Sequence, residues 1–169
     1  LEALNLPYGI TCIEYAVFAN CFNLKDIEIP ESVTTINNTA FVNCRSLTSI
    51  TIPDNVTSIG EYAFNGCSNL KSLYLPANIK TIGDAAFNCC GNLTRIIAKM
   101  KEPAAIGEDT FTGLDYDKCE LLVPEGSAEA YRQAAVWRNF SHITDITVVV
   151  TDYAGSLQYM IEKNDKNNI

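Results

Sequence analysis

Residues 53–75 read PDNVTSIGEYAFNGCSNLKSLYL, and the same 23-residue pattern also begins at Pro7, Pro30 and Pro76. The four copies align without a gap and share the frame P-x-x-[IV]-x-x-I-x-x-x-[AV]-F-x-x-C-x-x-L-x-x-[IL]-x-[ILA]. A unit this short cannot bury its own apolar face, so the copies must stack and share one continuous core. The repeat therefore predicts a solenoid, in which each unit contacts only its neighbours.

Each copy also predicts its own local structure. The spacing of Leu70, Leu73 and Leu75 ends in the alternation of a short strand, and the proline that follows ends it because proline donates no ladder hydrogen bond. The middle of each copy is predicted to form a helical or tight-turn segment. A degenerate fifth copy follows Ala98. The recurring aromatic residues are predicted to stack along the solenoid axis: Phe18, Phe41, Phe64, Phe87 and Phe111.

The chain contains seven cysteines, an odd number that does not suit a small disulfide-stapled scaffold. Four occupy one frame position and are predicted to form a column of buried thiols, which behave as small apolar groups. No paired C-x-x-C motifs are present to hold zinc. Cys89 is the thiol that we expect to be exposed. The column consists of Cys21, Cys44, Cys67 and Cys90.

Composition narrows the function classes. The 169 residues are 47% hydrophobic and 19% charged, which fits one globular domain. A net charge of −8 disfavours nucleic acid as a partner. The apolar stretch at residues 146–150 is far shorter than the ~20 residues of a membrane span, so no membrane insertion is expected. The opening residues lack a signal-peptide pattern, and we expect the chain to be a piece of a longer protein.

The A-F-x-x-C-x-x-L-x-x-I-x-I-P pattern resembles the BspA-like leucine-rich repeat family over about residues 1–143. The resemblance implies a leucine-rich repeat solenoid, an α/β-type right-handed stack of short parallel strands with short helical or turn segments and a C-terminal helical cap at residues 126–143. The residues themselves also indicate that cap. Ser127 is a plausible N-cap, and Ala130, Ala134 and Trp137 would share one helix face.

Residues 144–169 fall outside the repeat and are expected to be a tail or the start of a following module. Within them, ITVVV is predicted to form a strand, and SLQYMI a short helix or turn.

The family resemblance also implies a role. Similar proteins are typically bacterial surface or secreted proteins that adhere to host proteins or other cells. We therefore expect a non-catalytic protein-recognition or adhesion domain of a larger extracellular or cell-surface protein, with a host matrix or cell-surface protein as its partner. The alternative is a structural spacer or scaffold domain that has no ligand of its own.

A binding surface is expected on the outer face of the predicted sheet, where residues between the inward Leu and Ile positions must point outward. Tyr74, Ile97 and Leu122 would form an apolar patch there, and exposed apolar patches often mark partner sites. The alternative is that the insertions or the cap cover this patch. The full candidate protein-binding face is Glu28, Thr51, Tyr74, Ile97, Leu122, Asp26 and Arg95.

Catalysis has no candidate constellation in the sequence. His142 is the only histidine, and none of the motifs for phosphate loops, dinucleotides, zinc hydrolases or elbow serines occurs. No catalytic residue, cofactor or metal ligand is therefore predicted. Asp109, Asp115 and Asp117 could suggest calcium, but their spacing lacks the full loop pattern and favours solvated carboxylates.

Overall fold

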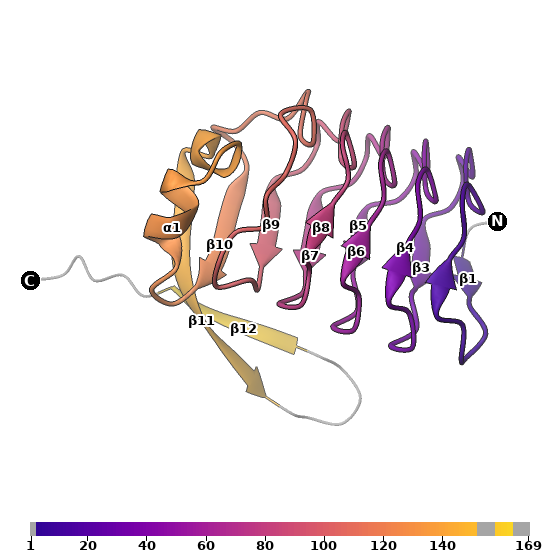
Figure 1. Cartoon of the computed structure of the whole chain (residues 1–169), viewed down its shortest axis with the longest axis horizontal. Coiled ribbons are helices and arrows are strands. Elements are labelled where there is room, and N and C mark those ends of the chain that lie inside the picture. Colours follow the sequence, from indigo (N-terminus) through magenta and orange to yellow (C-terminus); the bar gives the residue numbers. More distant parts are fainter. Residues whose placement is uncertain (1–2, 152–157, 164–169) are drawn as a thin grey trace, which may run out of the picture.

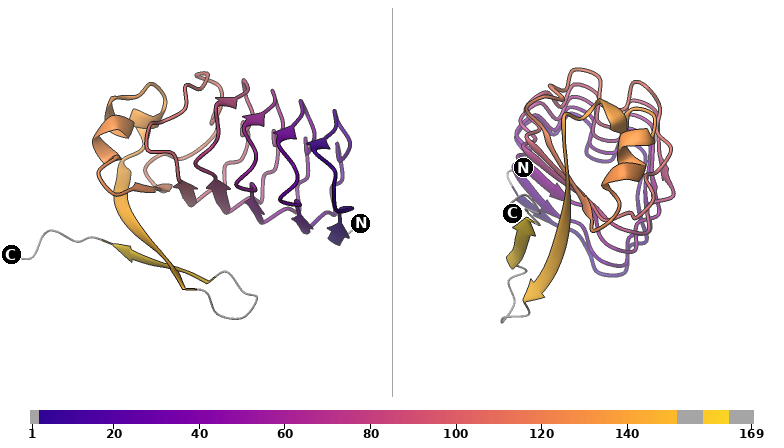
Figure 2. Two further views of the ribbon diagram at one scale, coloured as in Figure 1. Left: turned by 60° about the horizontal axis from the view of Figure 1, so that its bottom comes forward. Right: turned by 90° about the vertical axis from the view of Figure 1, so that its left-hand side faces the viewer.

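The protein forms a solenoid whose coils stack along one axis (Figure 1). The computed structural model describes residues 3–151 and 158–163. Consecutive coils pair in parallel with a register of one repeat, so that Ile50 lies opposite Leu73, and Leu73 opposite Ile96. Viewed along the axis, the coils superimpose as a ring, and the strand His142–Thr151 crosses the near end of the ring and extends past its edge (Figure 2). The solenoid predicted from the 23-residue frame is confirmed.

The strands that end each copy line up as one row of short parallel strands, which we call the first sheet. Strands β5, β7, β9 and β10 are hydrogen-bonded in that order, and β1 and β3 form a separate hydrogen-bonded pair at the N-terminal end of the row. Their inward residues are buried and their outward residues alternate with them, as in the exposed–buried–exposed pattern of β3. The bounds are β1 (Ala3–Asn5), β3 (Asp26–Glu28), β5 (Ser49–Thr51), β7 (Ser72–Leu75), β9 (Arg95–Ala98) and β10 (Glu120–Pro124).

A second parallel sheet lies in the other part of each coil, and the sequence did not predict it. Each of its strands has only two residues, and the second of these is an isoleucine that is buried in the core. A two-residue strand is too short to show alternation, so the single isoleucine of the frame gave no strand signal. The strands are β2 (Cys12–Ile13), β4 (Thr35–Ile36), β6 (Ser58–Ile59) and β8 (Thr81–Ile82).

The middle of each copy consists of tight turns, so the turn alternative is correct and the helical one is not. These turns are also paired between coils, because the Phe41 N–H donates to the Ala63 carbonyl at 2.7 Å and the Phe64 N–H to the Ala86 carbonyl at 2.8 Å. The turns need left-handed backbone at two frame positions. One of these columns consists of Asn20, Asn43, Gly66 and Cys89, with φ between 59° and 74°.

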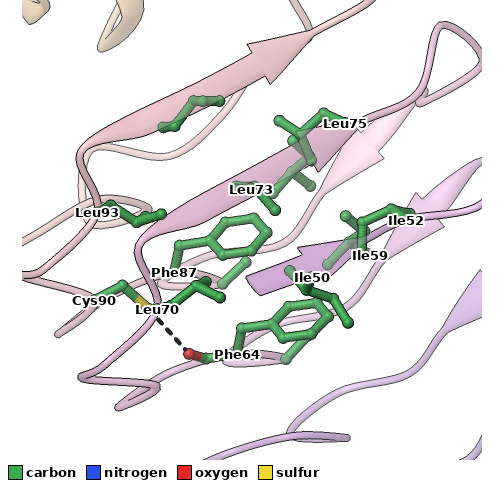
Figure 3. Close-up of a cluster of buried hydrophobic side chains, with 14 of the residues drawn as sticks. Ile50, Ile52, Ile59, Phe64, Leu70, Leu73, Leu75, Phe87, Cys90 and Leu93 are labelled. Atoms are coloured by element: carbon green, nitrogen blue, oxygen red, sulfur yellow. Dashed lines mark hydrogen bonds between the residues drawn. The ribbon is translucent and has the colours of Figure 1, made fainter. Parts of the chain in front are cut away.

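The predicted aromatic stack runs through the core. Neighbouring ring centroids lie 5.0 to 5.8 Å apart from Phe18 to Phe111, with interplanar angles of 19° or less. Phe64 and Phe87 lie among the inward leucines and isoleucines of both sheets (Figure 3). Offset-stacked rings at this separation add to the free energy gained from apolar burial. The stack therefore fixes the registration of the coils.

At the C-terminal end, the chain forms a short helix and one 3-10 turn, α1 (Ala128–Gln133) and η1 (Trp137–Asn139). Trp137 meets the end of the aromatic stack edge-on, with its ring centroid 5.6 Å from that of Phe111. The Ser127 side chain makes no capping hydrogen bond, and the Asp145 carboxylate instead accepts the Ala128 N–H at 2.8 Å. Because α1 ends before Trp137, the predicted shared helix face with Ala130 and Ala134 is wrong. That this segment closes the core as a cap stays a prediction.

The tail continues the first sheet. β11 (His142–Thr151) pairs in parallel with β10 and begins before the expected boundary at residue 144. It includes the predicted ITVVV strand. β12 (Gln158–Lys163) pairs with β11 in antiparallel fashion, so the predicted helix or turn is wrong for Gln158 to Ile161. Ser156 and Leu157, the first residues of that motif, lie outside the described residues.

Candidate functional site

Three of the four thiols in the predicted column are buried, whereas Cys21 at the N-terminal end is only partly buried. Cys44, Cys67 and Cys90 are fully buried, and each donates its Sγ–H to the carbonyl of the phenylalanine one coil earlier, as from Cys90 to Phe64 at 3.3 Å (Figure 3). Burial raises the pKa of Cys44 and of Cys90 to about 12. These thiols are protonated at neutral pH and are poor nucleophiles. Cys89 is exposed, as expected.

The groups considered for catalysis or calcium binding do not converge. His142 is exposed at the start of β11, and the neighbouring Ser141 hydroxyl donates to the Asp117 carboxylate. The Asp115 carboxylate pairs with the Lys118 ammonium at 2.6 Å, and this hydrogen bond holds the pKa of Asp115 below its usual value. Within residues 3–151 and 158–163, no three His, Cys, Asp or Glu side chains are grouped to hold a metal ion. The described part of the chain also contains no helix with the length and apolarity of a membrane span.

On the outer surface of the first sheet, which we call the sheet face, some candidate residues are exposed and others are buried. Asp26, Glu28, Thr51 and Arg95 are exposed, and Ile97 is partly buried. Tyr74 is only 8% exposed and Leu122 only 1%. The predicted exposed apolar patch is therefore wrong for these two residues.

The burial of Tyr74 has an identifiable cause. The Lys99 ammonium belongs to the irregular insertion at residues 99–102 after the fourth copy, and it lies 5.1 Å from the centre of the Tyr74 ring. It also lies 3.8 Å from the Asp54 carboxylate. Leu122 stands beside Thr144 of β11, the strand added next to β10. Of the alternative that the insertions or the cap cover the patch, the insertion part holds for Tyr74, whereas the residue beside Leu122 belongs to β11 and not to the predicted cap.

The C-terminal half of the sheet face is hollowed beside this covered patch. The groove has a volume of about 680 Å³ and combines apolar side chains with two lysines. Nearby, the Arg95 guanidinium and the Glu120 carboxylate form an ion pair at 3.3 Å. Charges of both signs thus lie close together in this half. The groove is lined by Ala77, Ile97, Ala98, Lys99, Lys101, Pro124, Glu125 and Ile146.

The N-terminal half of the sheet face holds two hollows, and the charged residues that line them are all acidic. A groove of about 370 Å³ runs over β3 and β5, and a smaller hollow of about 150 Å³ adjoins it over β1. Glu28 borders both. We call the larger one the acidic groove; it is lined by Asp26, Ile27, Glu28, Ile29, Glu31, Ser49, Thr51 and Pro53. The smaller one, the tyrosine hollow, is lined by Asn5, Leu6, Tyr8, Glu28 and Pro30.

Sequence reasoning found part of this surface and missed the rest. Asp26, Glu28 and Thr51 were among the candidates because they occupy outward strand positions. Tyr8 and Glu31 lie just after the prolines that end the strands, where alternation no longer predicts direction. The proline–acidic pairs at Glu31 and Asp54 recur one repeat apart and were the available signal.

Comparison with known proteins identifies the family. Residues 1–116 match the BspA-type leucine-rich repeat region in six copies. The chain belongs to the BspA-type leucine-rich repeat family. A search of curated proteins finds no match.

Crystal structures of several leucine-rich repeat proteins share this fold. A leucine-rich repeat protein from Bacteroides ovatus is 29% identical, with a TM-score of 0.62 over 73% of this chain and 33% of its own. The pneumococcal vaccine antigen PcpA is 26% identical, with a TM-score of 0.69 over 88% of this chain and 36% of its own. A Treponema pallidum leucine-rich repeat protein, at 20% identity and a TM-score of 0.52, shows the fold alone. The chain thus spans about a third of the length of the first two.

Proposed function

We propose that this BspA-type solenoid is a non-catalytic protein-recognition domain of a larger extracellular or cell-surface protein, and that it binds through the N-terminal half of its sheet face. The observation that carries the proposal is the exposure of Asp26, Glu28 and Thr51 around one groove, on a rigid row of parallel strands. A repeat scaffold holds such outward side chains at fixed spacing while its core stays unchanged.

The family and the fold relatives support the extracellular setting. The pneumococcal vaccine antigen PcpA, which shares 26% of aligned residues with this chain, supports that setting. The partner that we propose is a host matrix or cell-surface protein, which fits an adhesion role.

The test is binding of the purified chain to an array of matrix and cell-surface proteins. Thr51→Trp places a bulky neutral side chain in the groove, and Thr81→Trp places the same side chain at an exposed position of the second sheet. We expect an array partner that binds the parent chain and the Thr81→Trp variant but not the Thr51→Trp variant. Equal binding by both variants, or no array partner, would favour the spacer role instead.

A further inference from the structure

We propose that the acidic groove binds a cationic, extended segment of a partner protein, one that carries Lys or Arg at alternate positions. This inference rests on the proposed function and specifies the chemistry of the partner. Asp26, Glu28 and Glu31 are all exposed and line the same groove. Three carboxylates so placed raise the local concentration of a cationic partner and favour it over an anionic one.

These carboxylates differ from the other charges of the sheet face. In the described chain no Lys or Arg forms an ion pair with Asp26, Glu28 or Glu31. By contrast, Glu120 pairs with Arg95 of the adjacent strand β9, and Asp54 pairs with Lys99, which lies two coils further along. An incoming cation would therefore replace no ion pair that these three carboxylates make within the described residues.

The spacing of the carboxylates fits an extended segment. Asp26 and Glu28 point outward from alternate positions of β3. Alternate residues of a strand are about 6.8 Å apart, which is also the spacing of alternate side chains in an extended ligand. A segment lying along β3 can therefore place two cations over two carboxylates at once. The short side chains of Ser49 and Thr51 leave room beside it.

The tyrosine hollow offers a third contact for the same segment. The Tyr8 side chain is 99% exposed and lies in the hollow that shares Glu28 with the acidic groove. The face of an aromatic ring attracts an ammonium or guanidinium group. The described residues already include such contacts, Arg45 over Phe22 and Lys99 over Tyr74, each at 5.1 Å. Tyr8 thus extends the cationic site toward the N-terminal coil.

The experiment must separate the groove from the general negative charge of −8. The probe is a fluorescent ten-residue peptide of alternating Lys and Thr, followed by anisotropy at ~0.15 M salt. Asp26→Asn/Glu28→Gln changes the net charge from −8 to −8 + 2 = −6, and so does the control Glu61→Gln/Asp84→Asn in the exposed turns. We expect about tenfold weaker binding for the groove variant and less than about twofold for the control.

A second pair of variants tests the aromatic contact. Tyr8→Ala should weaken peptide binding about threefold, and Tyr8→Phe should leave it unchanged because the ring face is kept. Since Asp26, Glu28 and Tyr8 are exposed, these variants should fold normally, which circular dichroism would check. Equal losses in the groove variant and its control would overturn the proposal, as would absence of peptide binding. Either result leaves the array comparison of Thr51→Trp with Thr81→Trp as the separate test of the proposed function.

Discussion

Gly66 lies in a turn where an added methyl group has two separate costs. Its φ of +74° is in the left-handed region, and a Cβ at this position would overlap the Asn43 Oδ1 of the previous coil. The Asn43 amide in turn donates to the Asn20 Oδ1 at 3.0 Å. The substitution Gly66→Ala must therefore both strain the backbone and displace a side chain of this asparagine ladder.

The magnitude follows from these parts. A left-handed alanine costs about 1–2 kcal/mol, and the lower entropy of the unfolded alanine chain offsets about 0.4–1 kcal/mol of this. Moving the Asn43 amide breaks a hydrogen bond worth about 0.5–1.5 kcal/mol. We expect Gly66→Ala to lower the free energy of unfolding by about 2 kcal/mol. Gly126, with φ of +79° and open space around its would-be Cβ, is the matched control, and Gly126→Ala should cost about 1 kcal/mol.

Urea unfolding of both variants, followed by circular dichroism, measures these costs. A third variant separates the two terms, because Asn43→Gly removes the overlapping side chain while tolerating the left-handed backbone. In that background Gly66→Ala should cost only about 1 kcal/mol, so the double-mutant cycle should show a coupling of about 1 kcal/mol. Equal costs for the two glycine substitutions, or no coupling to Asn43, would refute the reasoning.

Three further predictions concern how substitutions or pH change the stability of the fold. Thr110→Val should raise the urea midpoint and increase the free energy of unfolding by about 1 kcal/mol, because the buried Thr110 Oγ1 has no hydrogen-bond partner among the described residues. A lower midpoint would contradict this. Burial raises the pKa of Cys44 and Cys90 from 9.0 to about 12, so the unfolded chain loses these protons first as pH rises. Their contribution to the free energy of unfolding is fully present below pH 9.0. It should be lost between pH 9.0 and about 12, by up to about 1.4 kcal/mol per pH unit for each thiol. Urea midpoints measured at pH 8 and pH 10 test this loss of stability, and Cys90→Ala should make the loss between the two pH values smaller. Trp137→Phe keeps an aromatic ring but removes the hydrogen bond from Nε1 to the Ala104 carbonyl at 2.8 Å. The substitution should lower the thermal midpoint and reduce the free energy of unfolding by about 2 kcal/mol. An unchanged midpoint would show that this hydrogen bond contributes nothing.

The features that were predicted correctly are those that follow from the 23-residue repeat. The solenoid, the stack that includes Phe64 and the thiol column that includes Cys67 all follow because a frame position keeps its place in every coil. What the sequence missed depends on contacts outside the frame. Lys99 lies in an insertion and covers Tyr74, and Asp145 caps a helix that begins 17 residues earlier. Such long-range contacts leave no periodic trace in one sequence.

The same reasoning explains how one scaffold produces a local binding surface. The frame fixes the inward residues of each coil but leaves the outward pairs free to vary, so Asp26 and Glu28 of β3 become Ser49 and Thr51 of β5. Because β5 occupies the same frame position as β3 one repeat later and lines the same groove, Ser49→Asp/Thr51→Glu should extend the acidic surface by one coil.

This variant should bind the alternating Lys–Thr peptide several-fold more tightly than the parent chain. It should also be slightly less stable, because like charges on neighbouring strands repel. The matched control is Thr34→Glu/Thr81→Glu, which adds the same charge at exposed positions away from the first sheet. If the control gains as much affinity, net charge alone explains the binding, and the groove has no special role. If only the groove variant gains, then the outward pair of each coil determines what the sheet face recognises.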